Sequence, residues 1–141
     1  MTSAVTRADA KWILFGEHLV VAGSPAIAFP LPTASLVVTA HVGEGGPPSI
    51  RLESHGREPR PGSGGRDPGA LRLALRLVGR RLRALPGPLT VVVSSTIPIG
   101  AGLGSSAALV VAMTDALHRL GVADGQRGLA RLRALERIFH A

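Results

Sequence analysis

A glycine-rich loop between two apolar segments is the part of this sequence best suited to bind a charged ligand. It runs Pro98-Ile99-Gly100-Ala101-Gly102-Leu103-Gly104-Ser105-Ser106. Glycines at alternate positions let the backbone turn sharply and come close to a bound group, and the two serines suit the cap and first turn of a helix. Unpaired N–H groups and the dipole at a helix start favour phosphate. The pattern predicts an anion-binding loop, with an ordinary strand-to-helix turn as the alternative.

Two familiar phosphate loops do not fit this pattern. A Walker loop requires Gly-Lys before Ser or Thr, and a dinucleotide loop requires Gly-x-Gly-x-x-Gly, whereas the glycines here stand at 100, 102 and 104. The stretch 98–108 instead resembles the second motif of the GHMP kinases, a superfamily of small-molecule kinases. The resemblance implies that the phosphates of ATP are bound by Pro98, Gly100, Ala101, Gly102, Leu103, Gly104, Ser105 and Ser106.

Lys11 is the only lysine of the chain and stands at the start of an apolar run that ends at Gly16, before Glu17 and His18. The residue types alone favour a solvated surface lysine and a structural polar pair. The stretch 11–28, however, resembles the N-terminal motif of the mevalonate kinases, one branch of the GHMP kinases. The resemblance implies that Lys11 is catalytic, stabilising the reacting hydroxyl and its base, and that Glu17 and His18 border the acceptor substrate.

Glu136 stands out near the end of the chain because of its place on a predicted helix. At about 100° per residue it lies within an apolar stripe, while Arg133 and Arg137 point away; the stripe is Leu129, Leu132, Leu135 and Phe139. A carboxylate on an inward face is costly unless it is paired or binds a cation, and a structural salt bridge is one solution. Residues 136–140 also resemble the Glu-x-x-x-His of the mevalonate kinases, which implies that Glu136 and Ser106 bind Mg²⁺.

The elements that must position these residues can be predicted from periodicity and from turn residues. Apolar β-rich runs predict strands at 11–15, 19–21, 26–29, 36–39, 50–53 and 89–94. Helices are predicted over 71–85, 105–120 and 124–140, with a loop over 57–69. The first helix should bury Leu71, Leu75, Val78, Leu82 and Leu85. The second is apolar on all sides over 107–112, so this part should be largely buried, and Gly121 should close the helix.

Composition limits the class of protein. A chain of 141 residues with 45% apolar content suffices for one globular domain, and the absence of cysteine excludes disulfides and thiolate metal sites. The long uncharged stretches 19–40 and 84–114 are broken by proline and glycine, so neither supplies an unbroken membrane span. No targeting segment is recognisable, and we expect a cytoplasmic protein that does not associate with membranes.

A net charge of +7 raises nucleic acid as a possible partner, with Arg72, Arg76 and Arg80 forming a row at helical spacing. Such a row on an outer helix face is usually only solvated. Aromatic residues make up 3% of the chain and tyrosine is absent, so no platform for stacking bases is recognisable. A basic RNA-binding domain is therefore the alternative of a different class, and we do not expect nucleic acid as the partner.

The fold class predicted is α+β, with a mixed, mostly antiparallel sheet and helices on one face. The resemblance implies the ribosomal-protein-like fold of a GHMP kinase N-terminal, ATP-binding domain over residues 1–141, ending before the family's catalytic-aspartate loop and C-terminal domain. It implies phosphorylation of the primary hydroxyl of mevalonate with ATP and Mg²⁺; a phosphomevalonate or sugar kinase is the alternative. We expect the chain alone to be inactive, with an exposed apolar surface that favours a homodimer.

Overall fold

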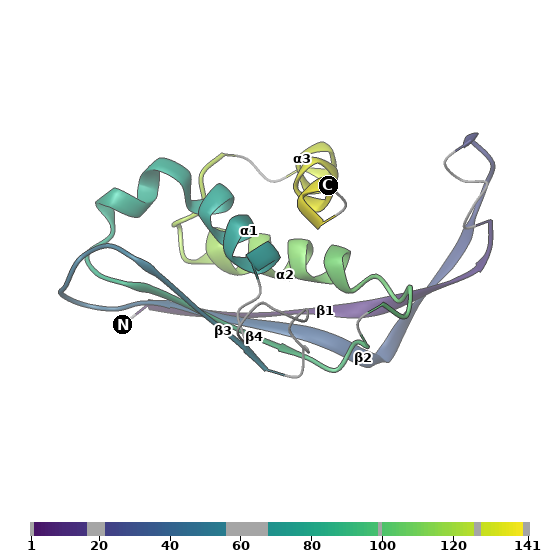
Figure 1. Cartoon of the computed structure of the whole chain (residues 1–141), viewed down its shortest axis with the longest axis horizontal. Coiled ribbons are helices and arrows are strands. Elements are labelled where there is room, and N and C mark those ends of the chain that lie inside the picture. Colours follow the sequence, from purple (N-terminus) through teal and green to yellow (C-terminus); the bar gives the residue numbers. More distant parts are fainter. Residues whose placement is uncertain (1, 17–21, 56–67, 99, 126–127, 140–141) are drawn as a thin grey trace.

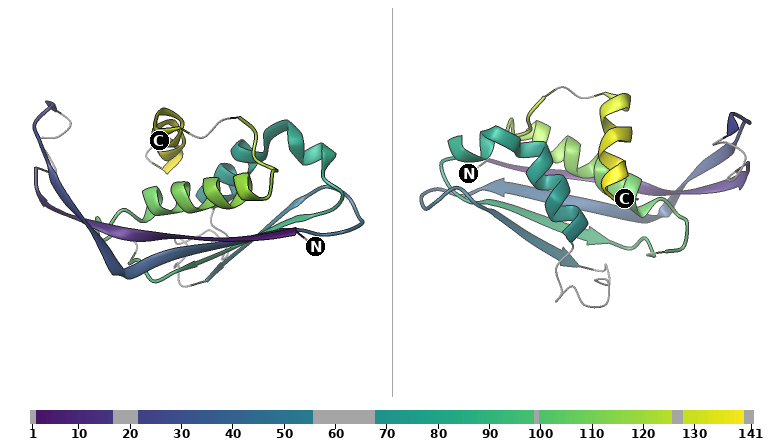
Figure 2. Two further views of the ribbon diagram at one scale, coloured as in Figure 1. Left: turned by 180° about the vertical axis from the view of Figure 1, so that it is seen from behind. Right: turned by 45° about the horizontal axis from the view of Figure 1, so that its top comes forward.

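The computed structural model describes residues 2–16, 22–55, 68–98, 100–125 and 128–139 (Figure 1). One sheet forms a layer, and the helices cover one of its faces (Figures 1 and 2). The strands are β1 (Thr2–Phe15), β2 (Ile27–Val42), β3 (Ile50–His55) and β4 (Leu89–Ser95). The helical elements are α1 (Pro68–Val78), η2 (Gly79–Ala84), α2 (Ser105–Arg119), α3 (Leu129–Glu136) and η3 (Arg137–Phe139).

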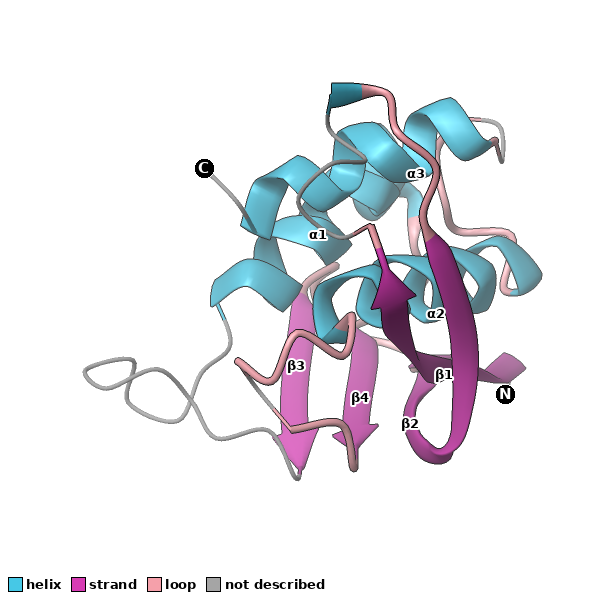
Figure 3. Ribbon diagram, turned by 90° about the vertical axis from the view of Figure 1, so that its right-hand side faces the viewer, coloured by secondary structure: helices cyan, strands magenta, loops and turns pink. Residues whose placement is uncertain are grey.

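The sheet has the strand order β1-β2-β4-β3. The pairs β1–β2 and β2–β4 are antiparallel, whereas β3 and β4 run parallel. Figure 3 shows the two layers from the side, with helices over strands. The predicted α+β class, with a mixed and mostly antiparallel sheet and helices on one face, is confirmed.

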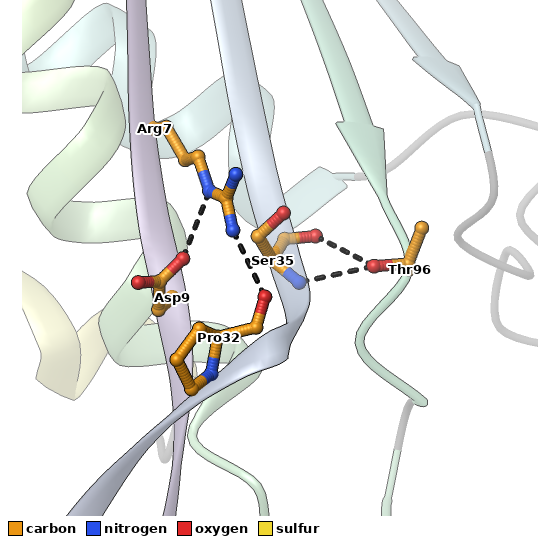
Figure 4. A network of polar contacts seen from close by, with 5 residues as sticks. All are labelled: Arg7, Asp9, Pro32, Ser35 and Thr96. Carbon is orange, nitrogen blue, oxygen red and sulfur yellow. Dashed lines mark hydrogen bonds and ion pairs between the residues drawn. The ribbon is translucent and has the colours of Figure 1, made fainter.

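Strand β1 begins at Thr2, so the prediction that the first ordered element starts at Lys11 is wrong. The segment before Lys11 alternates between small side chains that face the core and exposed side chains that face away from it. The core-facing residues are Ala4, Thr6 and Ala10, which are buried, and Ala8, which is half-buried. Arg7 and Asp9, which point outward, form an ion pair of 2.9 Å (Figure 4). Small residues give a weak hydrophobic signal, and this explains why the pattern was not recognised as a strand.

Strand β2 joins two predicted strands, 26–29 and 36–39, into one element that passes through Pro30 and Pro32. Proline lacks a backbone N–H, so a strand tolerates it only where no neighbouring strand needs that N–H as a donor. In β2 the pairing with β4 starts at Leu36, so the proline-containing part has only β1 beside it. Where β4 ends, Ser35 and Thr96 join the two strands through hydrogen bonds of 2.9–3.3 Å (Figure 4). The predicted strand 19–21 lies outside the described residues.

Helix α1 packs a different face on the sheet from the one predicted. Leu75, placed in the predicted stripe, is 45% exposed, and the predicted helix 71–85 changes into the 3-10 helix η2 at Gly79. The buried positions are Ala70, Leu73, Ala74, Leu77 and Val78. Both sets obey helical spacing, because apolar residues occupy most positions between 70 and 78. The contact with the sheet and α2 selects one of them. The predicted strands at 50–53 and 89–94 are confirmed as β3 and β4.

Helix α2 is confirmed and forms the centre of the helical layer. The apolar run 107–112 is largely buried, as predicted, although Val111 within it is 46% exposed. The hydroxyl of Thr6 on β1 donates to the Ala112 carbonyl over 2.7 Å and joins the helix to the sheet. Gly121 closes the end with φ +71° and an N–H bonded to the His118 carbonyl.

Helix α3 starts at Leu129 and not at 124 as predicted. The Asp124 N–H donates to the Leu77 carbonyl over 2.6 Å, which ties this segment to the end of α1. Leu135 is buried as expected, whereas Leu129 is 65% exposed. No helix in the described parts of the chain is long and apolar enough to span a membrane.

Candidate functional site

The glycine-rich loop connects the end of β4 to the start of α2, as predicted. Gly100, Gly102 and Gly104 have φ values of +79°, +69° and +74°, in the region that L side chains rarely adopt. Gly104 is the N-cap of α2 and accepts the Ala108 N–H over 2.9 Å. Ser105 therefore lies in the first turn and not at the cap, which is a correction to its predicted position. The loop needs glycine at all three positions.

The start of α2 presents the groups that bind anions. The first N–H groups of a helix have no partner within the helix, and here they belong to Ser105, Ser106 and Ala107. No acidic residue belongs to the first turn of α2 itself, and the positive end of the helix dipole adds to the attraction of these N–H groups for an anion. These residues are half-buried, and Pro98 and Ala101 on the approach to the helix are exposed. A phosphate group fits this arrangement.

Lys11 reaches this loop from β1, far away in the sequence. Its N–H donates to the Leu103 carbonyl over 3.0 Å. Its side chain lies across Gly104, because a Cβ built there would be 2.8 Å from Lys11 Cγ and 3.0 Å from Cε. Among the described residues no carboxylate forms an ion pair with its ammonium group. The cation is thus placed at the loop and is available to a ligand bound there.

Glu136 approaches the same loop from α3. The Ser106 hydroxyl donates to Glu136 Oε1 over 3.4 Å, so the two residues predicted to bind a metal ion lie together. Glu136 is half-buried, and Arg133 and Arg137 are exposed, as the helical spacing predicted. The stripe that carries Glu136 is only partly inward, since Leu129 at its start is exposed.

A hydroxyl and a carboxylate oxygen are donors that suit Mg²⁺, which prefers hard oxygen ligands. The described residues contain no group of three or more His, Cys, Asp or Glu that could hold a metal ion by themselves. Mg²⁺ in phosphate-binding enzymes is commonly held by one or two protein groups together with substrate phosphates. The pair Ser106 and Glu136 beside an anion-binding loop fits that second kind of site.

The predicted residues Glu17 and His18 lie outside the described residues. Gly16, which precedes them, ends β1 with φ +92°, and a Cβ there would be 2.5 Å from the Pro25 carbonyl oxygen. Its predicted role as a strand stop is confirmed. Sequence reasoning did not predict the contacts of Lys11 with Leu103 and Gly104, because no local pattern links a strand residue to a distant loop.

Comparison with known proteins adds the family context. The model of the GHMP kinases N terminal domain matches residues 70–141. The chain is 39% identical over 132 residues to the mevalonate kinase of Methanothermobacter thermautotrophicus, an alignment that covers 90% of this chain and 40% of that protein. It is 38% identical to the mevalonate kinase of Thermococcus sibiricus, covering 82% of this chain and 38% of that protein.

Solved structures agree in fold. Mevalonate kinase from methicillin-resistant Staphylococcus aureus matches with a TM-score of 0.65 and 27% identity, over 99% of this chain and 46% of that one. L. major mevalonate kinase in complex with R-mevalonate matches with a TM-score of 0.63 and 23% identity, over 98% of this chain and 41% of that one, and supports the fold alone. The chain spans about 40% of the length of the curated relatives cited above.

Proposed function

Because this chain belongs to the GHMP kinase family, we propose that residues 1–141 form the N-terminal, ATP-binding domain of a mevalonate kinase. In this proposal the whole enzyme transfers the γ-phosphate of ATP to the primary hydroxyl of mevalonate or a similar alcohol. The observation that carries the proposal is the convergence of Lys11, the start of α2 and Glu136 on one loop. The mevalonate kinases among the relatives support the proposed substrate class.

The loop is proposed to bind the phosphates through its backbone. The segment 100–106 carries left-handed glycines that turn its peptide groups toward a ligand without Cβ atoms in the way. Ser105 and Ser106 add the first N–H groups of α2, where the helix dipole favours negative charge. Pro98 removes one backbone donor and restricts φ at the entry to the loop.

Lys11 is proposed to act on the transferred group. Phosphoryl transfer depends on positioning and on neutralising charge at the reacting oxygens. An ammonium group at the loop would lower the energy of the alkoxide-like oxygen and the phosphoryl oxygens as charge develops between them. Glu17 and His18, which follow β1 in the sequence, are proposed to border the acceptor alcohol.

Ser106 and Glu136 are proposed to hold Mg²⁺ with the phosphates of ATP. When bound, the ion would neutralise phosphate charge. Ser106 supplies a hydroxyl oxygen and Glu136 a carboxylate oxygen, and the hydrogen bond of 3.4 Å keeps both side chains on the loop. The two residues come from different helices, so the packing of α3 beside α2 decides whether the pair exists.

The test of acceptor chemistry uses a chimera in which residues 1–141 replace the matching part of Methanothermobacter thermautotrophicus mevalonate kinase. We expect ADP release that depends on mevalonate and not on phosphomevalonate or galactose. The parent enzyme assayed in parallel sets the scale. If the chimera folds and binds MgATP but acts on a sugar, then a sugar and not mevalonate is the substrate. A chimera that folds without binding MgATP would overturn the proposal.

A further inference from the structure

The position of Lys11 on the sheet leaves its backbone N–H free to bond outside the ladder. Strand β1 is an edge strand, so one side of its backbone has no strand beside it. Lys11 lies opposite Pro30 of β2. The Lys11 N–H donates to the Leu103 carbonyl over 3.0 Å, which fixes the strand against the loop.

The side chain of Lys11 follows the same direction and crosses Gly104. A Cβ at position 104 would lie 2.8 Å from Cγ, 3.0 Å from Cε and 3.4 Å from Cδ of Lys11. Three of the four side-chain methylenes thus occupy the space that any other residue at 104 would need. Gly100 in the same loop has a similar φ, +79° against +74°, but a Cβ there would meet nothing within 4 Å.

From these contacts we infer that Leu103 and Gly104 are positioning residues: the carbonyl of Leu103 and the bare Cα of Gly104 form a seat that holds Lys11 over the start of α2. The seat is a property of the chain itself, and its value for phosphoryl transfer rests on the proposed function. A lysine side chain is a flexible four-carbon stem whose ordering costs conformational entropy. A seat that orders the stem before the ligand arrives removes part of that cost from binding and reaction.

The single lysine makes the seat directly measurable in the protein as given. Labelling with lysine that carries ¹³C at Cγ and Cε gives one set of side-chain NMR signals, from Lys11 alone. In the wild-type chain we expect nuclear Overhauser contacts between the Lys11 methylenes and the Gly104 Hα atoms. We also expect ¹³C relaxation to report a more restricted motion of the Lys11 Cε group than in free lysine. Absence of those contacts in a folded wild-type chain would overturn the seat without any variant.

The variant that tests the role of the glycine is Gly104→Ala, with Gly100→Ala as its matched control. Both substitutions place a methyl group at a φ near +75°, so both carry the same backbone strain and should lower Tm by similar amounts. Only Gly104→Ala should move the chemical shift of Lys11 Cε toward its value in an unfolded peptide. Only this variant should also remove the restricted motion of Lys11 Cε that ¹³C relaxation reports. Equal effects of the two variants, or none from Gly104→Ala, would contradict the inference.

A titration with magnesium tripolyphosphate separates the seat from the proposed function. In the wild-type chain and in Gly100→Ala, we expect bound polyphosphate to shift the Lys11 Cε signal; in Gly104→Ala we expect at least a several-fold smaller shift. A wild-type signal that is ordered but does not respond to polyphosphate would sustain the seat and count against the phosphate-binding loop. A full shift in Gly104→Ala would show that Lys11 needs no seat, and the inference would fail.

Discussion

Individual side chains from three distant parts of the sequence share one loop in this domain. Lys11 lies on Gly104, and Glu136 accepts a hydrogen bond from Ser106. Each of these contacts joins a charged side chain to the backbone or the first turn that is suited to bind phosphate. The chemistry proposed for the domain therefore depends on a few atoms whose replacement can be tested one at a time.

Replacing Lys11 by methionine should remove the cation while keeping an aliphatic chain of similar length on Gly104. In the chimera described above we expect kcat/KM for mevalonate to fall about 10²–10³-fold, the scale for losing one electrostatic stabiliser of a transition state. Thermal unfolding of Lys11→Met should match that of the unmodified chimera.

The matched control for that variant is Arg7→Met, which removes a cation from the same strand. Arg7 is exposed and bonds to Asp9 and to the Pro32 carbonyl, away from the loop. We expect kcat/KM to stay within about twofold, because surface ion pairs contribute little. A Lys11→Met enzyme with turnover equal to that of Arg7→Met would remove Lys11 from the catalytic residues.

Replacing Glu136 by glutamine should weaken ATP binding only in the presence of Mg²⁺. The amide keeps the size and hydrogen-bonding capacity of the side chain, but it is a poorer ligand for a hard cation. We expect the ratio of Kd values for ATP without and with Mg²⁺ to shrink about 10-fold or more, read from the fluorescence of Trp12, the only tryptophan.

Glu53→Gln is the control for that measurement. Glu53 lies exposed on β3, and its removal changes the net charge by the same amount as Glu136→Gln. We expect it to leave the ratio of Kd values unchanged. Loss of the Mg²⁺ effect in both variants would show a general charge effect and not a ligand at position 136.

At the scale of elements, the packing of α1 decides between two apolar stripes of equal spacing. Leu77 has 0% of its surface exposed, whereas Leu75 is 45% exposed. We expect Leu77→Ala to lower the free energy of unfolding by about 2–5 kcal/mol, as large-to-small changes in a core do. Leu75→Ala should cost less than about 1 kcal/mol. Urea denaturation with both variants checks the assignment, and the reverse order of costs would restore the stripe expected from the sequence.

The arginines of α1 provide the test between the two function classes. Arg72 and Arg76 border an open cavity of about 740 Å³ together with Arg137, a surface on which a polyanion could settle. RNA held by three such residues should lose about 40-fold in affinity when salt rises from about 50 to about 200 mM, because each phosphate contact adds about −0.9 to the salt slope. We expect MgATP binding to change far less and to be unaffected by Arg72→Gln, measured by titration at both salt concentrations.

The opposite result is RNA binding that is tighter than MgATP binding at the lower salt and that Arg72→Gln abolishes. It would favour RNA binding over the kinase function. A single oligonucleotide of mixed sequence is sufficient as the probe, because phosphate contacts do not depend on base identity.

At the scale of the whole molecule, one end of the β1–β2 hairpin extends beyond the helical layer (Figure 1). This end carries exposed apolar side chains, among them Trp12, whose ring stands 5.6 Å from that of Phe29. The exposed set is Trp12, Leu14, Phe15, Ile27 and Phe29. A patch of this kind marks a surface that another protein part covers or that self-associates.

We expect the 141-residue chain alone to give no measurable mevalonate phosphorylation and to self-associate. It spans about 40% of the length of its curated relatives, and in the proposed enzyme the groups that complete the site and exclude water come from outside residues 1–141. Product assays and light scattering after size-exclusion chromatography measure both properties. Steady turnover by a monodisperse monomer would overturn the proposal that residues outside 1–141 complete the active site.

Phe15→Ser and Val5→Ser distinguish the hairpin end from other exposed apolar positions on β1. The two residues have similar exposure, 65% and 59%, but only Phe15 lies in the patch. We expect Phe15→Ser to reduce self-association and Val5→Ser to leave it unchanged. Equal effects would place the contact elsewhere on the molecule.

The sequence by itself determined the features that depend on local geometry. The three loop glycines adopt the left-handed conformations that only glycine accepts readily, and β3, β4 and α2 follow from apolar runs bounded by turn residues. The outward direction of Arg133 and Arg137 also followed from helical spacing alone. These properties are set within a few residues, so the chain order contains all the information they need.

Only the tertiary structure decided the features that depend on which surfaces meet. Small side chains made the first half of β1 invisible to a hydrophobic pattern, and the free edge beside Pro30 allowed β2 to continue. Two stripes on α1 were equal until the sheet and α2 buried one of them. The contact of Lys11 with Gly104 joins residues that are 93 positions apart, and that of Ser106 with Glu136 joins residues that are 30 positions apart. Spacing along a chain does not specify such contacts, because they are chosen by the packing of β1, α2 and α3 into one core.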